Sequence, residues 1–128
     1  MILLLDTHLV LWAAGMPDRL SDEARELIDD ATNALCFSAA SLWEIAIESA
    51  LGRADFLVDP ALLRRGLRLN GWEEIPVTGE HALELVRLPP LHRDPFDRIL
   101  LCQARVQGTT LLTSDAKLAS YGAPARLV

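Results

Sequence analysis

Short apolar runs separated by longer amphipathic segments dominate the pattern of this chain. The first run, Ile2–Leu5, consists of four aliphatic residues without polar alternation, which is typical of a strand buried on both faces of a parallel sheet. The other segments predicted as strands are Ala34–Ser38, Trp72–Val77, Thr110–Thr113 and Ala125–Val128. We expect the Trp72–Val77 strand at a sheet edge, because Pro76 cannot donate a hydrogen bond to a ladder.

Helical segments lie between these strands, and several have clear start or stop signals. Asp59-Pro60 and Asp94-Pro95 each combine an N-cap with a proline at the first helical position. Gly52 and Gly108 are suited to left-handed helix ends. The predicted helices are a short one around Leu9–Trp12, one capped by Ser21 (Asp22–Ala31), Ala40–Leu51, Pro60 to about Asn70, one capped by Thr78 that ends at Leu88, one from Pro95 to Gly108, and a short one capped by Ser114. This alternation predicts an α/β fold in which helices cover both faces of a mostly parallel sheet.

Length and composition narrow the class of protein. With 128 residues the chain is expected to form one domain, residues 1–128. Its net charge of −6 argues against binding of duplex nucleic acid by general electrostatics. A hydrophobic content of 51% and a mean hydropathy of +0.22 leave apolar surface for a subunit or partner interface.

Targeting signals are not evident in the sequence. No apolar run approaches the roughly 20 residues of a membrane span, and the N-terminus lacks the basic region and cleavage site of a signal peptide. We therefore expect a cytoplasmic protein without membrane contact. In that compartment Cys36 and Cys102, which both lie in apolar segments, are expected to remain free buried thiols.

Acidic residues occur where strands end or helices begin, and they are the main candidates for chemistry. Ligands of open α/β sheets bind beyond the carboxyl ends of the strands. The candidates there are Asp6 after the first strand, Glu44 on the helix after the second, Asp97 in the first turn of the Asp94-Pro95 helix, and Asp115 after the Thr110–Thr113 strand. Carboxylates gathered at one edge repel each other unless cations bind, and oxygen ligands are those that Mg²⁺ and Mn²⁺ prefer. From spacing alone the chain is an α/β domain with an acidic metal site.

Each of these residues also has a structural explanation. Asp6 and Asp115 are suited to capping or charging the helix that follows, and Asp97 to complementing a helix dipole. For Asp94 we favour the role of an ordinary N-cap. Glu44 lies on an acidic stripe of an otherwise apolar helix, so that stripe faces either solvent or a cleft.

Other side chains near the strand ends are secondary candidates. Hydroxyls suited to orienting a ligand, although common at such positions, are those of Thr7, Ser38, Thr113 and Ser114. The three histidines, His8, His81 and His92, lack the i, i+4 spacing of a helical metal pair, and we interpret them as surface or packing residues. The alternative to a metal mechanism is that two of these histidines act on RNA as general acid and general base. The sequence has no glycine-rich phosphate loop, nucleophile elbow or paired-cysteine zinc pattern.

Four segments resemble the PIN-domain family, and within it the VapC-type toxins of bacterial and archaeal toxin–antitoxin pairs. They are Leu3–His8, Ser38–Ile47, Leu88–Arg98 and Leu111–Asp115, in the order and spacing of the family. The helix start Asp94-Pro95-Phe96-Asp97-Arg98 is the most specific of them. The resemblance runs nearly from end to end of the chain.

The resemblance implies a three-layer α/β/α fold and an endoribonuclease that depends on Mg²⁺, with Mn²⁺ as a substitute, and that arrests translation until a cognate antitoxin binds. By position, Asp6, Glu44, Asp97 and Asp115 form the acidic quartet, with Asp6 and Asp97 as direct metal ligands. A homodimer is also implied. Two alternatives remain on the same fold: a binding module without turnover, and a nuclease that cuts DNA.

One position departs from the family pattern. Relatives often carry a lysine one turn after the helix glutamate, where this chain has Glu48. Either a glutamate at this position weakens contact with RNA, or Glu48 simply faces water. We favour the second interpretation. Arginines near the proposed cleft are candidates for phosphate contact. They are Arg53, Arg93 and above all Arg98, for which a structural ion pair is the competing interpretation.

Overall fold

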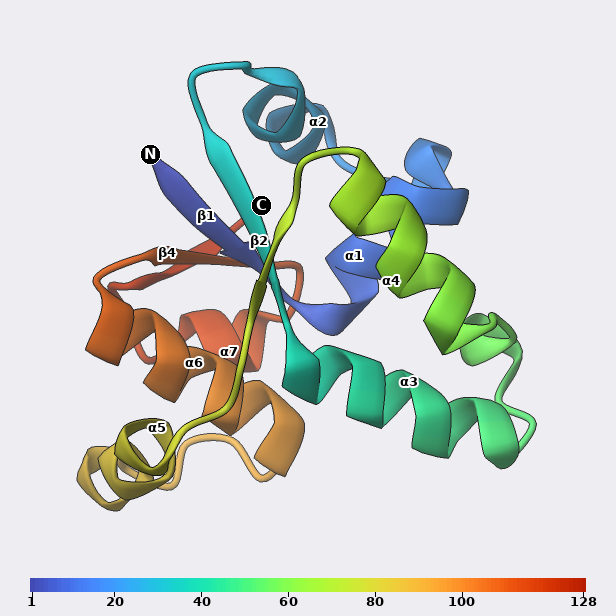
Figure 1. Ribbon diagram of the computed structural model, residues 1–128. Coiled ribbons are helices and arrows are strands. Elements are labelled where there is room, and N and C mark those ends of the chain that lie inside the picture. Colours follow the sequence, from blue (N-terminus) through green and yellow to red (C-terminus); the bar gives the residue numbers. More distant parts are fainter.

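A five-stranded parallel sheet lies at the centre of the computed structural model, which describes residues 1–128 except for the side chain of Asp55 (Figure 1). The strand order is β3-β2-β1-β4-β5, and every neighbouring pair is parallel. The strands are β1 (Ile2–Leu5), β2 (Ala34–Ser38), β3 (Glu73–Ile75), β4 (Thr110–Thr113) and β5 (Ala125–Leu127). The predicted strands are thus all present, and β3 lies at the edge as expected, although it ends before Pro76.

Helices cover both faces of this sheet and form the outer layers of the fold. They are α1 (Thr7–Gly15), α2 (Asp22–Asp29), α3 (Ala39–Ala50), α4 (Pro60–Leu69), α5 (Gly79–Glu84), α6 (Pro95–Gln107) and α7 (Ala116–Ala119), with 3₁₀ turns at Pro17–Arg19, Ala54–Phe56 and Leu85–Arg87. In Figure 1, α1, α2 and α4 lie on one side of the sheet and α5, α6 and α7 on the other. The predicted three-layer α/β fold is confirmed. None of the helices described is long and apolar enough to cross a lipid bilayer.

Alternation along the central strand separates the core into two halves. Leu3 and Leu5 pack into the cluster beneath α1, α2 and α4, whereas Leu4 packs into the cluster beneath α6 and α7. All three side chains are buried. Because both faces of β1 are covered, the unbroken aliphatic run at the N-terminus is the pattern that this position requires.

Most of the predicted helix signals act as expected. Ser21, Asp59 and Asp94 each accept a backbone N–H from the first turn of the following helix. Gly108 ends α6 with φ of 67°, and Gly52 follows α3 with φ of 73°.

Three expectations need correction. The N-cap of α7 is Asp115 and not Ser114, because Oδ1 of Asp115 accepts the N–H of Lys117 in the first turn. The α-helix that begins after Thr78 ends at Glu84 and continues only as a 3₁₀ turn. Helix α3 is less buried than its apolar sequence predicted: Trp43 is 65% exposed, because the helix extends outward from the end of β2 (Figure 1).

The order of the strands places a crevice at one end of the sheet. From β1 the chain proceeds outward to β2 and β3, and then returns to the other side of β1 for β4 and β5. The direction of winding therefore reverses between β1 and β4. In open α/β sheets this switch point, at the carboxyl ends of the strands, is where ligands bind.

Candidate active site

Asp6 lies at the switch point and is held there by three donors. Its Oδ1 accepts the N–H of Leu9 at 2.9 Å, so it caps α1, while its Oδ2 accepts the hydroxyl of Thr113 at 2.6 Å and the N–H of Ser114 at 3.3 Å. The side chain is only 4% exposed. Burial raises the pKa of Asp6 above its ordinary value, and the hydrogen bonds from Thr113 and Leu9 oppose that rise. Asp6 is thus both a helix cap and a member of the crevice.

Glu44 faces the same crevice from α3. The hydroxyl of Thr7 donates to its Oε1 at 2.7 Å and lies 2.9 Å from Oγ of Ser41. Burial, together with the neighbouring carboxylates of Asp94, Glu48 and Asp6, raises the pKa of Glu44 to about 7 despite this hydrogen bond. The acidic stripe of α3 therefore turns inward at Glu44.

Glu48, one turn further along α3, is half-buried and lies in an ion pair with Arg53 at 3.4 Å. The position that departs from the family pattern therefore neither points freely into water nor leaves an unpaired charge. Arg53 is engaged in this ion pair, which weakens its candidacy for phosphate contact.

Asp97 reaches the crevice from the first turn of α6. Asp94 begins that helix: its Oδ1 accepts the N–H of Phe96 at 2.8 Å and that of Asp97 at 3.4 Å. The preference for Asp94 as an N-cap is confirmed. The cap leaves the Asp97 side chain directed at the strand ends, where it meets acids from distant parts of the chain.

The charge around Asp97 is the clearest electrostatic feature of the site. Burial, followed by the carboxylates of Asp94, Asp6, Glu44 and Asp115, raises the pKa of Asp97 to about 8. Each of these acids was expected near the same sheet edge or helix start. The side chains of Asp97 and Asp115 do lie together, with ligand atoms within 4.8 Å of each other.

Asp115 completes the cluster from the end of β4. Its Oδ1 accepts the N–H of Lys117 at 2.8 Å, and its own N–H donates to Oγ1 of Thr113 at 2.9 Å. Burial raises the pKa of Asp115, but the hydrogen bonds from His92 and Lys117 outweigh burial, so the pKa lies below its ordinary value. Asp115 is therefore the acid of this group that remains ionised most readily.

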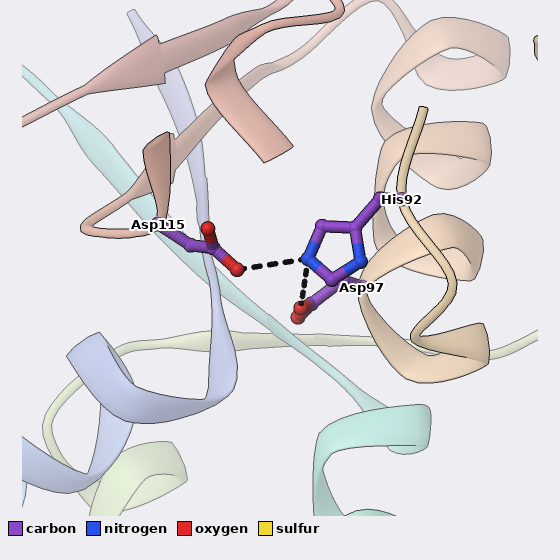
Figure 2. Close-up of side chains that lie close together, drawn as sticks. All are labelled: His92, Asp97 and Asp115. Atoms are coloured by element: carbon purple, nitrogen blue, oxygen red, sulfur yellow. Dashed lines mark hydrogen bonds and ion pairs between the residues drawn. The ribbon is translucent and has the colours of Figure 1, made fainter. Parts of the chain in front are cut away.

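His92 is part of this site, although its spacing in the sequence gave no reason to select it. Figure 2 shows its imidazole between two carboxylates: Nε2 lies 2.8 Å from Oδ2 of Asp115 and 3.2 Å from Oδ2 of Asp97. The interpretation of His92 as an ordinary surface or packing residue is wrong. Its position two residues before Asp94, within the Leu88–Arg98 segment that resembles the family, was the one available signal.

The secondary candidates are mostly engaged with the acids or with helix ends. The hydroxyls of Thr7 and Thr113 donate to Glu44 and Asp6 as described, and the buried hydroxyl of Ser38 accepts the N–H of Ala40 at the start of α3. Ser114 is exposed. These contacts fit a role in fixing the acids more directly than a role in contacting a substrate.

Among the described residues, Arg98 has no carboxylate partner. Its Nε is buried and has no hydrogen-bond partner, and the arginine ion pairs seen in the described residues do not include it. The competing interpretation of Arg98 as part of a structural ion pair is therefore not supported.

The donor set fits a hard divalent cation. In the part of the chain described here, Oε2 of Glu44 and Oδ1 of Asp97 accept no hydrogen bond from the protein. The arginine ion pairs likewise involve other acids, namely Glu23, Glu48, Glu74 and Glu84. Carboxylates crowded so closely that one has its pKa raised to about 8 are stabilised by a bound cation, and Mg²⁺ and Mn²⁺ prefer such oxygens. Among the described residues, the ligand atoms of His92, Asp97 and Asp115 lie within 4.8 Å of one another, and Asp6 and Glu44 are near enough to raise the pKa of Asp97.

Fold and site together define an α/β domain with a carboxylate cluster at the switch point of a parallel sheet. Comparison with known proteins makes the class specific: the model of the PIN domain family matches residues 3–124. The chain belongs to the PIN domain family.

Individual relatives agree with that assignment. Over 122 residues, which are 94% of this chain and 92% of the relative, it is 30% identical to "Ribonuclease VapC22" of Mycobacterium tuberculosis. Among solved structures, VapBC2 from Rickettsia felis bound to a promoter DNA fragment matches with a TM-score of 0.69 at 18% identity, covering 100% of this chain and 98% of that one. VapC20 of M. tuberculosis, described as a sarcin-ricin loop cleaving toxin, matches with a TM-score of 0.64 at 16% identity, covering 94% and 95%. The resemblance to VapC-type proteins is confirmed.

Proposed function

We propose that this protein is an endoribonuclease that requires a divalent cation, and that it is the toxin of a toxin–antitoxin pair. One observation carries the proposal: acids from four distant segments converge at the switch point, where burial and mutual repulsion raise the pKa of Glu44 to about 7 and that of Asp97 to about 8. The relationship to a protein named as a ribonuclease supports RNA as the substrate.

In the proposed mechanism the protein supplies a rigid set of oxygens, with Asp6 and Asp97 as the direct ligands. Bound Mg²⁺ or Mn²⁺ would polarise phosphate oxygens and lower the pKa of a water molecule that attacks the phosphodiester. Thr113 and Ser114 fix Asp6, and Thr7 orients Glu44. Glu44, with a pKa of about 7, is suited to accept and release a proton at neutral pH.

The products identify the mechanism. Attack by water leaves a 5′-phosphate and a 3′-hydroxyl, whereas acid–base chemistry by histidines without metal leaves a 2′,3′-cyclic phosphate. The experiment incubates the purified protein with matched RNA and single-stranded DNA, with Mg²⁺, with Mn²⁺ and with EDTA. We expect cleavage of RNA only, by either cation, with a 5′-phosphate end, and no cleavage in EDTA.

Other outcomes of this experiment contradict specific parts of the proposal. Cleavage in EDTA with a cyclic end contradicts the metal mechanism, and cleavage of DNA contradicts the assignment to RNA. If RNA binds but no substrate is cut under any condition, the protein is a binding module and the proposal of an enzyme is wrong.

An antitoxin is the proposed protein partner. Solved structures of similar fold include VapBC assemblies, and this chain has an apolar groove of about 880 Å³ between α1 and α4. Leu57 and Leu62, which line it, are 68% and 65% exposed. Removing such apolar side chains from water favours association with a partner that covers them.

The product of a reading frame next to this gene is the protein to test as antitoxin. We expect it to inhibit RNA cleavage and to co-purify with this chain. The variant Leu62→Glu should lose both inhibition and co-purification while it retains nuclease activity. If the neighbouring gene product inhibits Leu62→Glu as strongly as it inhibits the parent protein, the antitoxin does not bind in this groove.

We also propose a homodimer. Exposed apolar side chains occur on α5 and the turn that follows it, where Leu83 is 73% and Val86 86% exposed, and on α3, where Trp43 packs edge-on against Phe96 with ring centroids 5.4 Å apart. Sedimentation equilibrium should give twice the mass of 14.1 kDa. A single-chain mass at micromolar concentration would contradict this part of the proposal.

A further inference from the structure

His92 is the buried group at this site that the proposed mechanism does not use. Its side chain is 10% exposed, and its ring points from the segment before α6 into the space between Asp97 and Asp115 (Figure 2). The shorter of its two carboxylate contacts, 2.8 Å to Oδ2 of Asp115, has the geometry of a hydrogen bond. The contact to Asp97 is longer, at 3.2 Å.

The backbone next to His92 determines which ring nitrogen carries hydrogen. The N–H of Asp94 donates to Nδ1 of His92 at 3.1 Å, so Nδ1 is an acceptor and has no hydrogen of its own. The ring hydrogen is therefore on Nε2, which donates it to Asp115. A nitrogen that carries hydrogen has no lone pair for a metal.

The ring is also fixed in place from behind. The backbone N–H of His92 donates to the hydroxyl oxygen of Tyr121 at 3.2 Å, and that hydroxyl donates to the carbonyl oxygen of Pro89 at 2.8 Å. These two bonds connect the segment before α6 to the segment after α7. The position of the imidazole is therefore determined by the fold and does not depend on a bound cation.

From these contacts we infer that His92 is a positioning residue, which holds the carboxylate of Asp115 toward the metal site through Nε2–H and is not itself a metal ligand. Both oxygens of Asp115 are then fixed, Oδ1 by the N–H of Lys117 and Oδ2 by His92. Because the Asp115 side chain is 40% exposed, it is free to turn into solvent when His92 is removed.

The expected effect of His92 on metal binding rests on the proposed function. The position of the hydrogen on its ring does not. Groups that orient the carboxylates around a metal typically contribute about 10- to 100-fold to metal affinity. We therefore expect His92 to act on cation affinity, and to do so only through Asp115.

Two substitutions distinguish the roles of the two ring nitrogens of His92. His92→Gln places an amide N–H at the position of Nε2 and so retains a donor for Asp115. His92→Asn places an oxygen near the position of Nδ1 and so retains the acceptor for the Asp94 N–H, but has no group that reaches Asp115. The two variants are matched in polarity, and neither offers a nitrogen ligand.

Mn²⁺ affinity by isothermal titration is the first measurement. We expect His92→Asn to weaken Mn²⁺ binding by about tenfold or more and His92→Gln to stay within about threefold of the parent. In an Asp115→Asn background, His92→Asn should have no further effect. An equal loss in both variants, or a loss that persists in the Asp115→Asn background, overturns the inference, as does parental affinity in His92→Asn.

Nitrogen-15 NMR of the metal-free protein is the second measurement. Long-range proton–nitrogen correlations should show hydrogen on Nε2 of His92 and none on Nδ1, with the Nε2 proton shifted by Asp115→Asn. Hydrogen on Nδ1 overturns the inference. If the parent protein binds no Mn²⁺ at all, the proposed metal-dependent function fails, and the NMR spectrum still decides the role of His92.

Discussion

The two sides of the acidic crevice are constructed differently. On one side, Asp6 and Glu44 are less than 10% exposed and each accepts a threonine hydroxyl, from Thr113 and Thr7 respectively. On the other side, Asp97 and Asp115 are more accessible and flank the imidazole of His92.

Distance from the sheet explains this difference. Asp6 follows β1 directly, and Thr113 is the last residue of the adjacent strand β4, so the register of the sheet determines their contact. Asp97 lies at the start of α6, and Asp115 follows the end of β4. Because strand pairing does not set the distance between these two side chains, a third group must hold them at a defined separation. One side is thus fixed by strand pairing and the other by the segment that carries His92.

The largest effect is expected from Asp97→Asn. The change replaces a carboxyl group, which ionises when a cation binds, by an amide of nearly the same size, and so removes a ligand on which several kcal/mol of transition-state stabilisation depend. We expect turnover to fall by roughly a thousandfold or more, measured with a labelled RNA. Asp29→Asn, an exposed change on α2, is the control and should leave activity unchanged. Normal turnover of the Asp97 variant would remove this residue from the site.

The strand side of the crevice is tested by Thr113→Val. Valine has the shape of threonine but neither donates to Asp6 nor accepts the N–H of Asp115, so Asp6 loses its 2.6 Å hydrogen bond and both carboxylates are less well oriented. We expect Mg²⁺ affinity and turnover to fall by about 10- to 100-fold. The matched control is Thr110→Val in the same strand, which should have little effect on either. If both variants behave alike, the Thr113 hydroxyl does not orient Asp6.

The raised pKa values predict how stability depends on pH. In the folded protein Glu44 and Asp97 keep their protons up to about 7 and about 8, against ordinary values of 4.5 and 3.8. The folded state therefore binds more protons than the unfolded state within this window, so these two groups make the metal-free protein less stable as pH rises through it.

A cation reverses that loss, because it binds the carboxylates only after the protons leave. The rise in Tm caused by Mg²⁺ should be several degrees larger at about pH 8.5 than at about pH 6. Glu44→Gln should reduce this difference between the two pH values. A Tm shift that is independent of pH would mean that these acids do not bind the cation.

A smaller effect is expected from Tyr121→Phe on the other side of the crevice. This change removes the hydroxyl that accepts the N–H of His92 and donates to Pro89, and should cost about 1 kcal/mol in the free energy of unfolding. Turnover should fall only a few-fold, since the Nδ1 contact with Asp94 still orients the ring. Urea unfolding and initial rates measure the two effects. A loss of activity as large as that of Asp97→Asn would show that the Asp94 contact alone does not hold His92.

Much of the fold and half of the site could be predicted from the sequence, because they depend on local signals. The apolar run before Asp6 sets the central strand, and the Asp94-Pro95 pair sets the start of α6 with Asp97 in its first turn. Both acids therefore lie where strand and helix ends place them. The same logic identified Glu44 as the acid of α3 that faces either solvent or a cleft.

The contacts that could not be predicted depend on the path of irregular segments. The position of His92 is set by Tyr121 and Asp94 across a stretch without periodic pattern. Ser114 was expected to cap α7, but its N–H donates to Asp6 and the cap is Asp115, whose side chain accepts the N–H of Lys117. The contacts of His92 with Tyr121 and of Ser114 with Asp6 each join residues more than 20 positions apart, which local sequence signals do not report.

Anomalous diffraction from crystals soaked in Mn²⁺ tests the account most directly. We predict a manganese peak within coordination distance of carboxylate oxygens of Asp6 and Asp97, next to Glu44 and with no nitrogen of His92 among its ligands. A peak elsewhere on the molecule, or no peak in a protein that cleaves RNA, would contradict the claim that these acids form a single cation site.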